Sequence, residues 1–323
     1  MNRPLNSDPR QGNKSQLPFN QPSVEFSAMT NMSFLNRFLC PLACVAALAT
    51  VGCATTDHAF PHVHAAAPLT QKSVPVKANI GYTNTPIIPG TSWHVHDGTR
   101  PQPRIVTPGS TFSHLAPPPS DAIVLFDGHD LAKWQLGNGS PASWKVENGY
   151  MEVAPKTGSI RTKDKFADFQ LHIEFATPAK VDGSSQGRGN SGILLNGVYE
   201  IQVLDCWENP TYPDGQTGAL YGQSPPLVNA SKPPGTWQSY DIIWESPRWD
   251  ADKKITKKAN VTVIHNGVVL HHKREYTGTS PHQNNGTYDR PHAPEMFIEL
   301  QDHNNPMRFR NIWLRKLGGY DKP

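Results

Sequence analysis

The chain has few charged residues, and their signs nearly cancel. Asp, Glu, Lys and Arg make up 18% of 323 residues, below the roughly 25% that is usual, and the formal net charge is +3. No basic block stands out beyond the scattered pairs Lys253-Lys254 and Lys257-Lys258. Nucleic-acid binding needs a concentrated basic surface, so the composition argues against nucleic acid as a partner.

The chain also lacks an apolar run long enough to cross a bilayer comfortably. The run at residues 38–51 is broken by Pro41, follows Asn36-Arg37 and ends at Gly52-Cys53. This arrangement is typical of a secretory signal. The junction resembles a bacterial lipoprotein box, although Thr50 stands where that motif has Leu. We therefore expect an exported bacterial protein, periplasmic or anchored to the membrane through a lipid on Cys53.

Cysteine is scarce, with four residues in the whole chain. Cleavage before Cys53 would remove Cys40 and Cys44, and Met29 or Met32 are alternative translation starts for so deep a signal. Cys206 would then be the single thiol of the mature domain. One thiol forms no disulfide framework, so stability must come from a hydrophobic core.

The sequence predicts three regions: a polar extension plus lipoprotein-type signal over 1–53, a tether over 54–120, and a folded domain over 121–323. The tether is rich in Pro, Thr, Ser, His and Ala, with little apolar periodicity, which is typical of disorder. Its histidines are poor metal ligands without fixed neighbours to orient them. The stretch from Trp93 to His96 is an alternative short strand.

The domain lacks both a long helical period and a repeat of 20–50 residues. Instead, alternating runs are separated by turn pairs such as Asn148-Gly149, Asn196-Gly197 and Asn266-Gly267, which are strong hairpin signals. We expect strands at residues 123–126, 144–153, 169–175, 192–195, 198–204, 239–245, 259–265, 268–271, 296–301 and 309–317. About ten strands in about 200 residues predict an all-β sandwich or jelly roll of two antiparallel sheets.

The expected strand at residues 199–205, YEIQVLD, carries the most chemistry. Alternation turns its apolar residues to a core, while Glu200 and Gln202 point to the opposite side. One β-bulge would bring Asp205 to the same side. Two acids and an amide on one sheet face suit a groove that processes sugars. An ordinary antiparallel strand with one solvent-exposed face shows the same alternation.

The other strands add further polar residues on alternate positions. If these strands share one curved sheet, their polar faces gather His172, Glu174, Glu200, Gln202, Asp241, Glu299, Gln301 and His303. This collection would suit a concave carbohydrate groove. In the alternative arrangement, some of the strands belong to the convex sheet and simply face water.

Four residues at strand ends or in loops are further candidates. Arg161 can clamp a pair of oxygens or form a structural ion pair with Glu174 or Asp168. Asn190 can point its amide into a groove or hold a left-handed turn. Tyr221 can act as an acid or as a stacking ring. His303, beside Asp302, can serve acid–base chemistry or metal binding, or be a plain surface histidine.

Seven segments, in order, resemble the 3-keto-disaccharide hydrolase family: LFDGHDLAKW, IRTKDKFADFQLHIEF, GRGNSGILL, YEIQVLD, DGQTGALYGQSPPLVNA, WQSYDII and LQDHNNPMRFRNIWLR. The resemblance runs from about residue 123 to 317. It implies a concanavalin A-like jelly roll and a glycosidase-type hydrolase that acts on sugars already oxidised at C3. An upstream sugar 3-dehydrogenase is then the expected pathway partner.

The implied chemistry starts with a proton at C2 that the neighbouring ketone makes acidic. A base removes it, the C1 oxygen leaves by β-elimination, and water adds. Our hypotheses are Glu200 or Asp205 as base, Arg161 with Gln202 at the oxyanion, and His303 or Tyr221 as acid. Glu174, Asn190, Gln216 and Gln301 are expected to bind substrate. A divalent metal on His303 and Glu200 is an alternative electrophile; no other cofactor is expected.

Two other functions fit part of the pattern. The spacing of Glu200, Gln202 and Asp205 resembles the Glu-x-Asp-x-x-Glu strand of laminarinase- and lichenase-type retaining glucanases. It departs from that pattern twice, because Gln replaces the middle Asp and Asp the last Glu. The third function is a non-catalytic module that binds carbohydrate at the cell surface, since one fold hosts both roles.

Overall fold

A computed structural model describes residues 70–75 and 80–319 of the chain. The expected export signal and the lipidation site Cys53 lie outside the described residues. Within the described part, no helix is long and apolar enough to cross a membrane.

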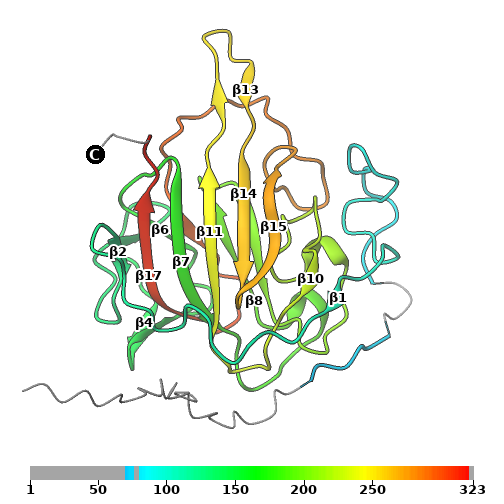
Figure 1. The fold of residues 1–323 in the computed structure, drawn as a ribbon, viewed down its shortest axis with the longest axis horizontal. Helices are drawn as coiled ribbons and strands as arrows, with labels where there is room; N and C mark the ends of the chain where they lie inside the picture. Colours follow the sequence, from blue (N-terminus) through cyan, green and yellow to red (C-terminus); the bar gives the residue numbers. More distant parts are fainter. Residues whose placement is uncertain (1–69, 76–79, 320–323) are drawn as a thin grey trace, which may run out of the picture. The chain divides into compact units, whose positions relative to one another are not determined.

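The described part is built from β-strands in two main antiparallel sheets (Figure 1). The larger sheet consists of β2 (Ile123–Phe126), β4 (Lys145–Glu147), β5 (Tyr150–Glu152), β7 (Phe169–Ala176), β11 (Gln238–Glu245), β14 (Asn260–His265), β15 (Val268–Glu275) and β17 (Arg308–Lys316). Their order is β15-β14-β11-β7-β17-β5-β4, and β2 also pairs with β17. The smaller sheet has the order β3 (Trp134–Leu136), β6 (Ile160–Thr162), β16 (Glu299–Leu300), β8 (Asn190–Leu195) and β9 (Tyr199–Leu204).

The remaining elements are short. A parallel pair joins β1 (Arg104–Ile105) to β10 (Val228–Asn229), and an antiparallel pair joins β12 (Arg248–Trp249) to β13 (Ile255–Lys257). Two 3-10 helices, η1 (Ser185–Gly187) and η2 (Pro213–Gly215), complete the described part.

The three Asn-Gly pairs form the hairpin turns that the sequence predicts. Asn148-Gly149 joins β4 to β5, Asn196-Gly197 joins β8 to β9, and Asn266-Gly267 joins β14 to β15. Both residues of each pair have positive φ, between 49° and 82°. Positive φ at both central residues matches the right-handed twist of the flanking strands, which is why Asn-Gly is favoured there. The prediction of an all-β sandwich of two antiparallel sheets is confirmed.

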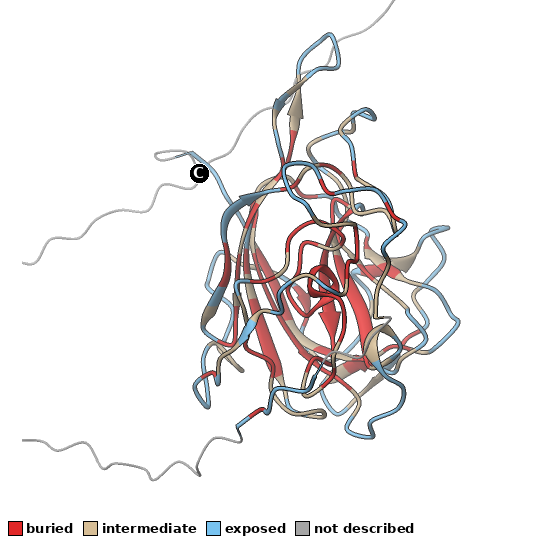
Figure 2. Cartoon of the chain, turned by 90° about the vertical axis from the view of Figure 1, so that its right-hand side faces the viewer, coloured by how far each residue is buried: buried red, intermediate tan, exposed pale blue. Residues whose placement is uncertain are grey.

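The core lies between the two sheets and comes from alternate residues of their strands. On β9, the residues that belong to the hydrophobic core are Tyr199, Ile201 and Val203. Tyr199 packs on Trp244 of β11 with ring centroids 5.3 Å apart, and the Tyr240 hydroxyl donates to the Gln202 carbonyl at 2.9 Å. Figure 2 shows the buried residues concentrated along the strands. The alternation read from the sequence therefore selects the correct inward face of β9.

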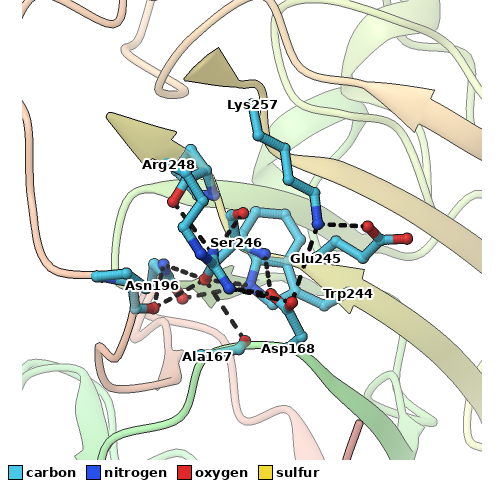
Figure 3. Close-up of polar contacts among 10 residues, drawn as sticks. Ala167, Asp168, Asn196, Trp244, Glu245, Ser246, Arg248 and Lys257 are labelled. Atoms are coloured by element: carbon cyan, nitrogen blue, oxygen red, sulfur yellow. Dashed lines mark hydrogen bonds and ion pairs between the residues drawn. The ribbon is translucent and has the colours of Figure 1, made fainter. Parts of the chain in front are cut away.

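A polar cluster fixes the β8–β9 turn against the end of β11 (Figure 3). The Asn196 side-chain amide donates to Ser246 Oγ at 2.7 Å, and the Trp244 indole donates to the same oxygen at 3.1 Å. The Ser246 amide donates to Asp168 Oδ1 at 2.8 Å, and Arg248 pairs with the same carboxylate at 3.0 Å. These bonds tie the hairpin that contains β9 to the larger sheet.

The expectation of one pooled polar face is wrong, because His172, Glu174 and Asp241 belong to the larger sheet. Glu174 Oε2 accepts from Arg310 at 2.7 Å, and Glu174 Oε1 accepts from the Leu115 amide at 2.5 Å. Burial alone would raise the pKa of Glu174, but hydrogen bonds, including those from His172 and Arg310, lower it to about 2. Glu174 is therefore a structural ion-pair residue, remote from Glu200.

The region expected to be a tether differs from that expectation in its described part. Ile88, Val95 and His96 are all buried, and β1 pairs with β10 of the domain. Pro and Thr are the commonest residues here, but two buried apolar residues, Ile88 and Val95, are enough to anchor irregular chain. Periodicity does not reveal such packing, because it requires a regular element. A bridge between Ile87 and His94 replaces the short strand considered for Trp93 to His96.

Replacing Ile88 by Ala should lower the free energy of unfolding by about 2–4 kcal/mol, because its side chain is only 2% exposed. Replacing its neighbour Ile87, which is 53% exposed, should change it by less than about 0.5 kcal/mol. Urea denaturation of both variants measures the difference. Equal, small effects would mean that this segment does not pack on the domain.

Candidate functional site

A cavity of about 780 Å³ lies on the face of the smaller sheet that points away from the core. We call it the Glu200 cavity. Its sheet-side lining consists of Asn190, Leu194, Glu200, Gln202, Gln301 and His303. The rest of the lining comes from loops: Ile80, Gly81, Tyr82, Ser184, Ser185, Gln186, Gly187, Tyr212, Tyr221, Ser280 and His282.

Strand register brings the sheet residues of the cavity together. Gln202 on β9 pairs with Gly192 on β8, and the Gln301 amide donates to the Gly192 carbonyl at 3.0 Å. Glu200 pairs with Leu194 in the same way. Directly paired residues point to one side of a sheet, so these side chains share one surface. The structure thus gathers six predicted site residues in one cavity: Asn190, Glu200, Gln202, Tyr221, Gln301 and His303.

The carboxyl group of Glu200 is the most unusual group in the cavity. The residue is 6% exposed, and its carboxyl oxygens make no hydrogen bond to any described residue. A methyl group on Gly192 would overlap this carboxyl, so the glycine leaves the room that Glu200 occupies. Burial raises the pKa of Glu200 to about 8. Such a carboxyl exchanges protons near neutral pH, as a general base or acid requires.

Tyr221 stands beside Glu200 because its backbone amide donates to the Glu200 carbonyl at 3.2 Å. Its hydroxyl lies 3.1 Å from the Tyr212 hydroxyl and 3.2 Å from His282 Nδ1. Burial raises the pKa of Tyr221, the bond with Tyr212 opposes this, and the charge of Glu200 raises it further. The hydroxyl therefore keeps its proton and can donate it.

His303 lies in the cavity lining but is not paired with Asp302, as one interpretation of the sequence had it. The Asp302 carboxylate instead accepts from the backbone amides of Gly158 at 3.0 Å and Asn304 at 2.9 Å. His303 is exposed and makes no hydrogen bond among the described residues.

The structure does not bring Asp205 to the cavity. Its carboxylate accepts from Arg188 Nε at 2.7 Å and from the Trp207 amide at 3.1 Å, so the expected bulge is absent and the side chain is used structurally. Gln216 also lies elsewhere, bonded to Gln102 at 2.5 Å.

Arg161 shares the outer face of the smaller sheet but does not line the cavity. It pairs across the strands with Glu299, which pairs with Leu194 opposite Glu200. Three strand spacings therefore separate it from Glu200, roughly 14 Å at 4.8 Å each. Its guanidinium instead stacks over the Phe297 ring at 4.5 Å.

Gln186 is a site residue that the sequence reading missed. Its side-chain oxygen accepts from the Gln202 amide at 2.8 Å, and its backbone carbonyl accepts from the Asn190 amide at 2.7 Å. Its own amide is held by Thr211 at 2.8 Å. Gln186 sits in η1 within a Gly/Ser-rich loop, and nothing in that composition distinguishes it from an ordinary turn.

The partners of Tyr221 and the flanking loop residues were missed for the same reason. Tyr212, His282, Ser280 and Tyr82 come from irregular segments, so no periodicity points them at the sheet.

The residues present do not fit a metal centre. Among residues 70–75 and 80–319, no group of three or more His, Cys, Asp or Glu side chains is arranged to hold a metal ion. His282, His303 and Glu200 all line the cavity, but they are not arranged as a group that could hold a metal ion. We therefore derive no step through a metal ion.

The stability of the protein should fall with rising pH because of Glu200. Its pKa is about 8 in the folded chain against an ordinary 4.5, so the folded state holds the proton more tightly. The stabilisation is complete below about pH 4.5 and is lost at up to about 1.4 kcal/mol per pH unit towards pH 8. Replacing Glu200 by Gln should remove this slope in urea denaturations from pH 5 to 9. Parallel curves for the two proteins would contradict the assignment.

Comparisons with known proteins add an independent line of evidence. The sequence model of the family described as a 3-keto-alpha-glucoside-1,2-lyase-like domain matches residues 121–315. A candidate glycosyl hydrolase from Parabacteroides distasonis is 48% identical, with a TM-score of 0.62, over 67% of this chain and 93% of its own. Two further candidate glycosyl hydrolases from that organism are 19% and 22% identical, with TM-scores of 0.46 and 0.44. They match over 61% of this chain and 94% and 99% of theirs.

The comparison with curated proteins gave no match. The family match covers more than half of the chain and includes every strand from β2 to β16, together with Glu200 and Tyr221. On this evidence, the chain belongs to the 3-keto-alpha-glucoside-1,2-lyase-like family.

Proposed function

We propose that this chain is a carbohydrate-active enzyme that cleaves the glycosidic bond of 3-keto-glycosides. The reaction runs by removal of the C2 proton, β-elimination at C1 and addition of water. Family membership supports this proposal, since the family description names 3-keto-glucosides and lyase chemistry. The 48% identical candidate glycosyl hydrolase supports a glycosidase-type activity.

The observation that carries the proposal is the single carboxylate of the Glu200 cavity. Among the described residues that line it, Glu200 is the one acid. Retaining and inverting glycosidases usually need two carboxyl groups, about 5–5.5 Å or 6.5–9.5 Å apart. Asp205, the second acid of the glucanase-like pattern, is paired with Arg188 outside the cavity. Elimination from a 3-keto sugar needs only one such base.

Glu200 acts as the base in this scheme. Its carboxylate takes the C2 proton, and the electron pair forms the enolate with the C3 oxygen. A pKa of about 8 makes the carboxylate a much stronger base than an exposed glutamate, while leaving some of it ionised near neutral pH. The electron pair of the enolate then forms the C1–C2 double bond as the bond between C1 and the leaving oxygen breaks.

Amide groups around Glu200 are suited to stabilise the enolate oxygen. Gln301 lines the cavity, and its side-chain amide makes no hydrogen bond among the described residues. Gln202 lines the cavity too, with one amide hydrogen committed to Gln186 and a second one free. Fixed donors aimed at developing negative charge typically contribute about 2.7–4 kcal/mol each to lowering a barrier. Arg161, outside the lining, has no role at this oxygen.

Tyr221 acts as the acid that protonates the leaving oxygen. Its hydroxyl remains protonated, and its bonds to Tyr212 and His282 fix its direction. His282 is exposed, so it can return a proton to Tyr221 from solvent. Water then adds its hydroxyl at C1 and its proton at C2, which completes the hydrolysis. A sugar 3-dehydrogenase would supply the oxidised substrate.

Turnover of 3-keto-trehalose in deuterated water should release 3-keto-glucose with deuterium at C2, as followed by NMR. Replacing Glu200 by Gln should lower the rate by about 10²–10⁴-fold, because the base is lost. Replacing Glu299 by Gln is the matched control, since Glu299 lies on the same sheet face outside the cavity lining.

Trehalose and laminarin, both unoxidised, should not be cleaved in the same assay. Cleavage of laminarin alone would instead favour the retaining glucanase. Binding of these sugars without any cleavage would favour the carbohydrate-binding module. EDTA should leave the rate unchanged if the amide donors, and not a metal ion, stabilise the enolate.

We also propose that the enzyme is an exported bacterial lipoprotein of the periplasm, on the sequence of residues 36–53 alone. Replacing Cys53 by Ser should move the expressed protein from the membrane fraction to the soluble fraction of a bacterial host. Replacing the buried Cys206 by Ser is the control and should leave the distribution unchanged. Equal membrane recovery for both variants would overturn the proposed anchor.

A further inference from the structure

One wall of the Glu200 cavity comes from outside the region that matches the family. The matched region begins at residue 121, yet Ile80, Gly81 and Tyr82 line the cavity. We call residues 80–98 the N-terminal wall. The cavity is therefore shaped partly by a segment that the family description does not cover.

Close backbone contacts hold the two ends of the N-terminal wall together. Gly81 bridges to Asp97, and the Tyr82 amide donates to the His96 carbonyl at 2.8 Å. A methyl group on Gly98 would overlap the carbonyl oxygen of Ile80, so only glycine allows this approach. Tyr82 directly follows Gly81, and these backbone contacts fix where Gly81 lies.

A buried contact between His96 and Asp214 fixes the wall to the rest of the domain. The His96 amide donates to Asp214 Oδ2 at 2.8 Å, and His96 Nδ1 lies 3.4 Å from Asp214 Oδ1. Both residues are fully buried. The His96 ring lies 4.3 Å from the Tyr212 ring and 4.7 Å from the Tyr221 ring, between centroids. The wall is thus packed directly against the proposed acid.

Tyr82 lies at the end of the cavity that contains Tyr221, the proposed acid. Its ring centroid lies 6.2 Å from that of His282 and 6.3 Å from that of Tyr212, the two residues bonded to Tyr221. Its ring is half-buried, and its hydroxyl makes no hydrogen bond among the described residues. The acid Tyr221 must contact the oxygen that leaves. Tyr82 lies next to the partners of Tyr221, so it faces the leaving group and not the oxidised ring.

We propose that Tyr82 is a specificity-determining residue that packs against the leaving group when that group is a second sugar ring. This inference rests on the proposed function. The apolar face of a pyranose buries surface against an aromatic ring, whereas a small alcohol offers little to bury. Tyr82 therefore contributes to the turnover of 3-keto-disaccharides and not to that of 3-keto-glycosides of simple alcohols.

The test compares two substrates with the same oxidised ring: 3-keto-trehalose, which releases a sugar, and methyl 3-keto-α-glucoside, which releases methanol. Replacing Tyr82 by Ala should lower kcat/KM for the disaccharide by about 10-fold or more, the scale of one lost apolar contact. The value for the methyl glycoside should stay within about twofold. Replacing Tyr82 by Phe should keep both values, since the ring and not the hydroxyl makes the contact.

Equal losses on both substrates, or no loss on either, would overturn the role of Tyr82 and leave the proposed function standing. No turnover of either substrate by the unaltered enzyme would overturn the proposed function itself, and this inference with it.

A second pair of variants tests whether the wall places Tyr82. Replacing Gly98 by Ala should produce the same selective loss on the disaccharide, because the added methyl group pushes Ile80 and its neighbours away. Gly109 is the control glycine, since its φ is ordinary and an added Cβ would meet only the Thr111 carbonyl at 3.7 Å. Full disaccharide activity in the Gly98 variant would overturn the placement of Tyr82 by this contact.

Discussion

The structure depends on how β9 is held between the core and the Glu200 cavity. Tyr199, Ile201 and Val203 are locked into the interior, and the strand's period of two then leaves Glu200 and Gln202 no other side to occupy. A slip of one residue would bury the carboxylate in the core and expose three large apolar side chains. Hydrophobic packing and the placement of the Glu200 carboxyl are therefore one constraint, enforced by the same residues.

That constraint explains why an unpartnered carboxyl can persist at this position. Glu200 is desolvated without a compensating hydrogen bond among the described residues, which opposes folding whenever it is ionised. The core side chains opposite it and the polar cluster around Ser246 provide the offsetting stability. Glu174 is the contrasting case, since four hydrogen-bonding partners keep it ionised and fix it as structure.

Alternation and Asn-Gly turns predicted the sandwich, because both signals are local and survive in any all-β context. The same alternation correctly placed Glu200 and Gln202 on the outward face of their strand. Alternation does not show which of the two sheets a strand joins, so the sequence wrongly grouped Glu174 with Glu200. Asp205 and Gln216 were misplaced because their partners, Arg188 and Gln102, meet them only after folding. Residues 80–98 have no regular period, so their packing through Ile88 and Val95 left no pattern to detect.

The polar cluster at the β8–β9 turn limits which parts of the site can change. Trp244, Ser246 and Asn196 join the floor of the cavity to the larger sheet, so the Glu200 carboxyl cannot shift without disturbing both sheets. The rim is made of irregular loops, including the one with Tyr82, and none of these loops carries Glu200. Changes in the length or sequence of these loops can alter which ligands enter while the Glu200 carboxyl stays in place. The position of the Glu200 carboxyl is thereby set by the sandwich, whereas the shape of the entrance is set by the loops.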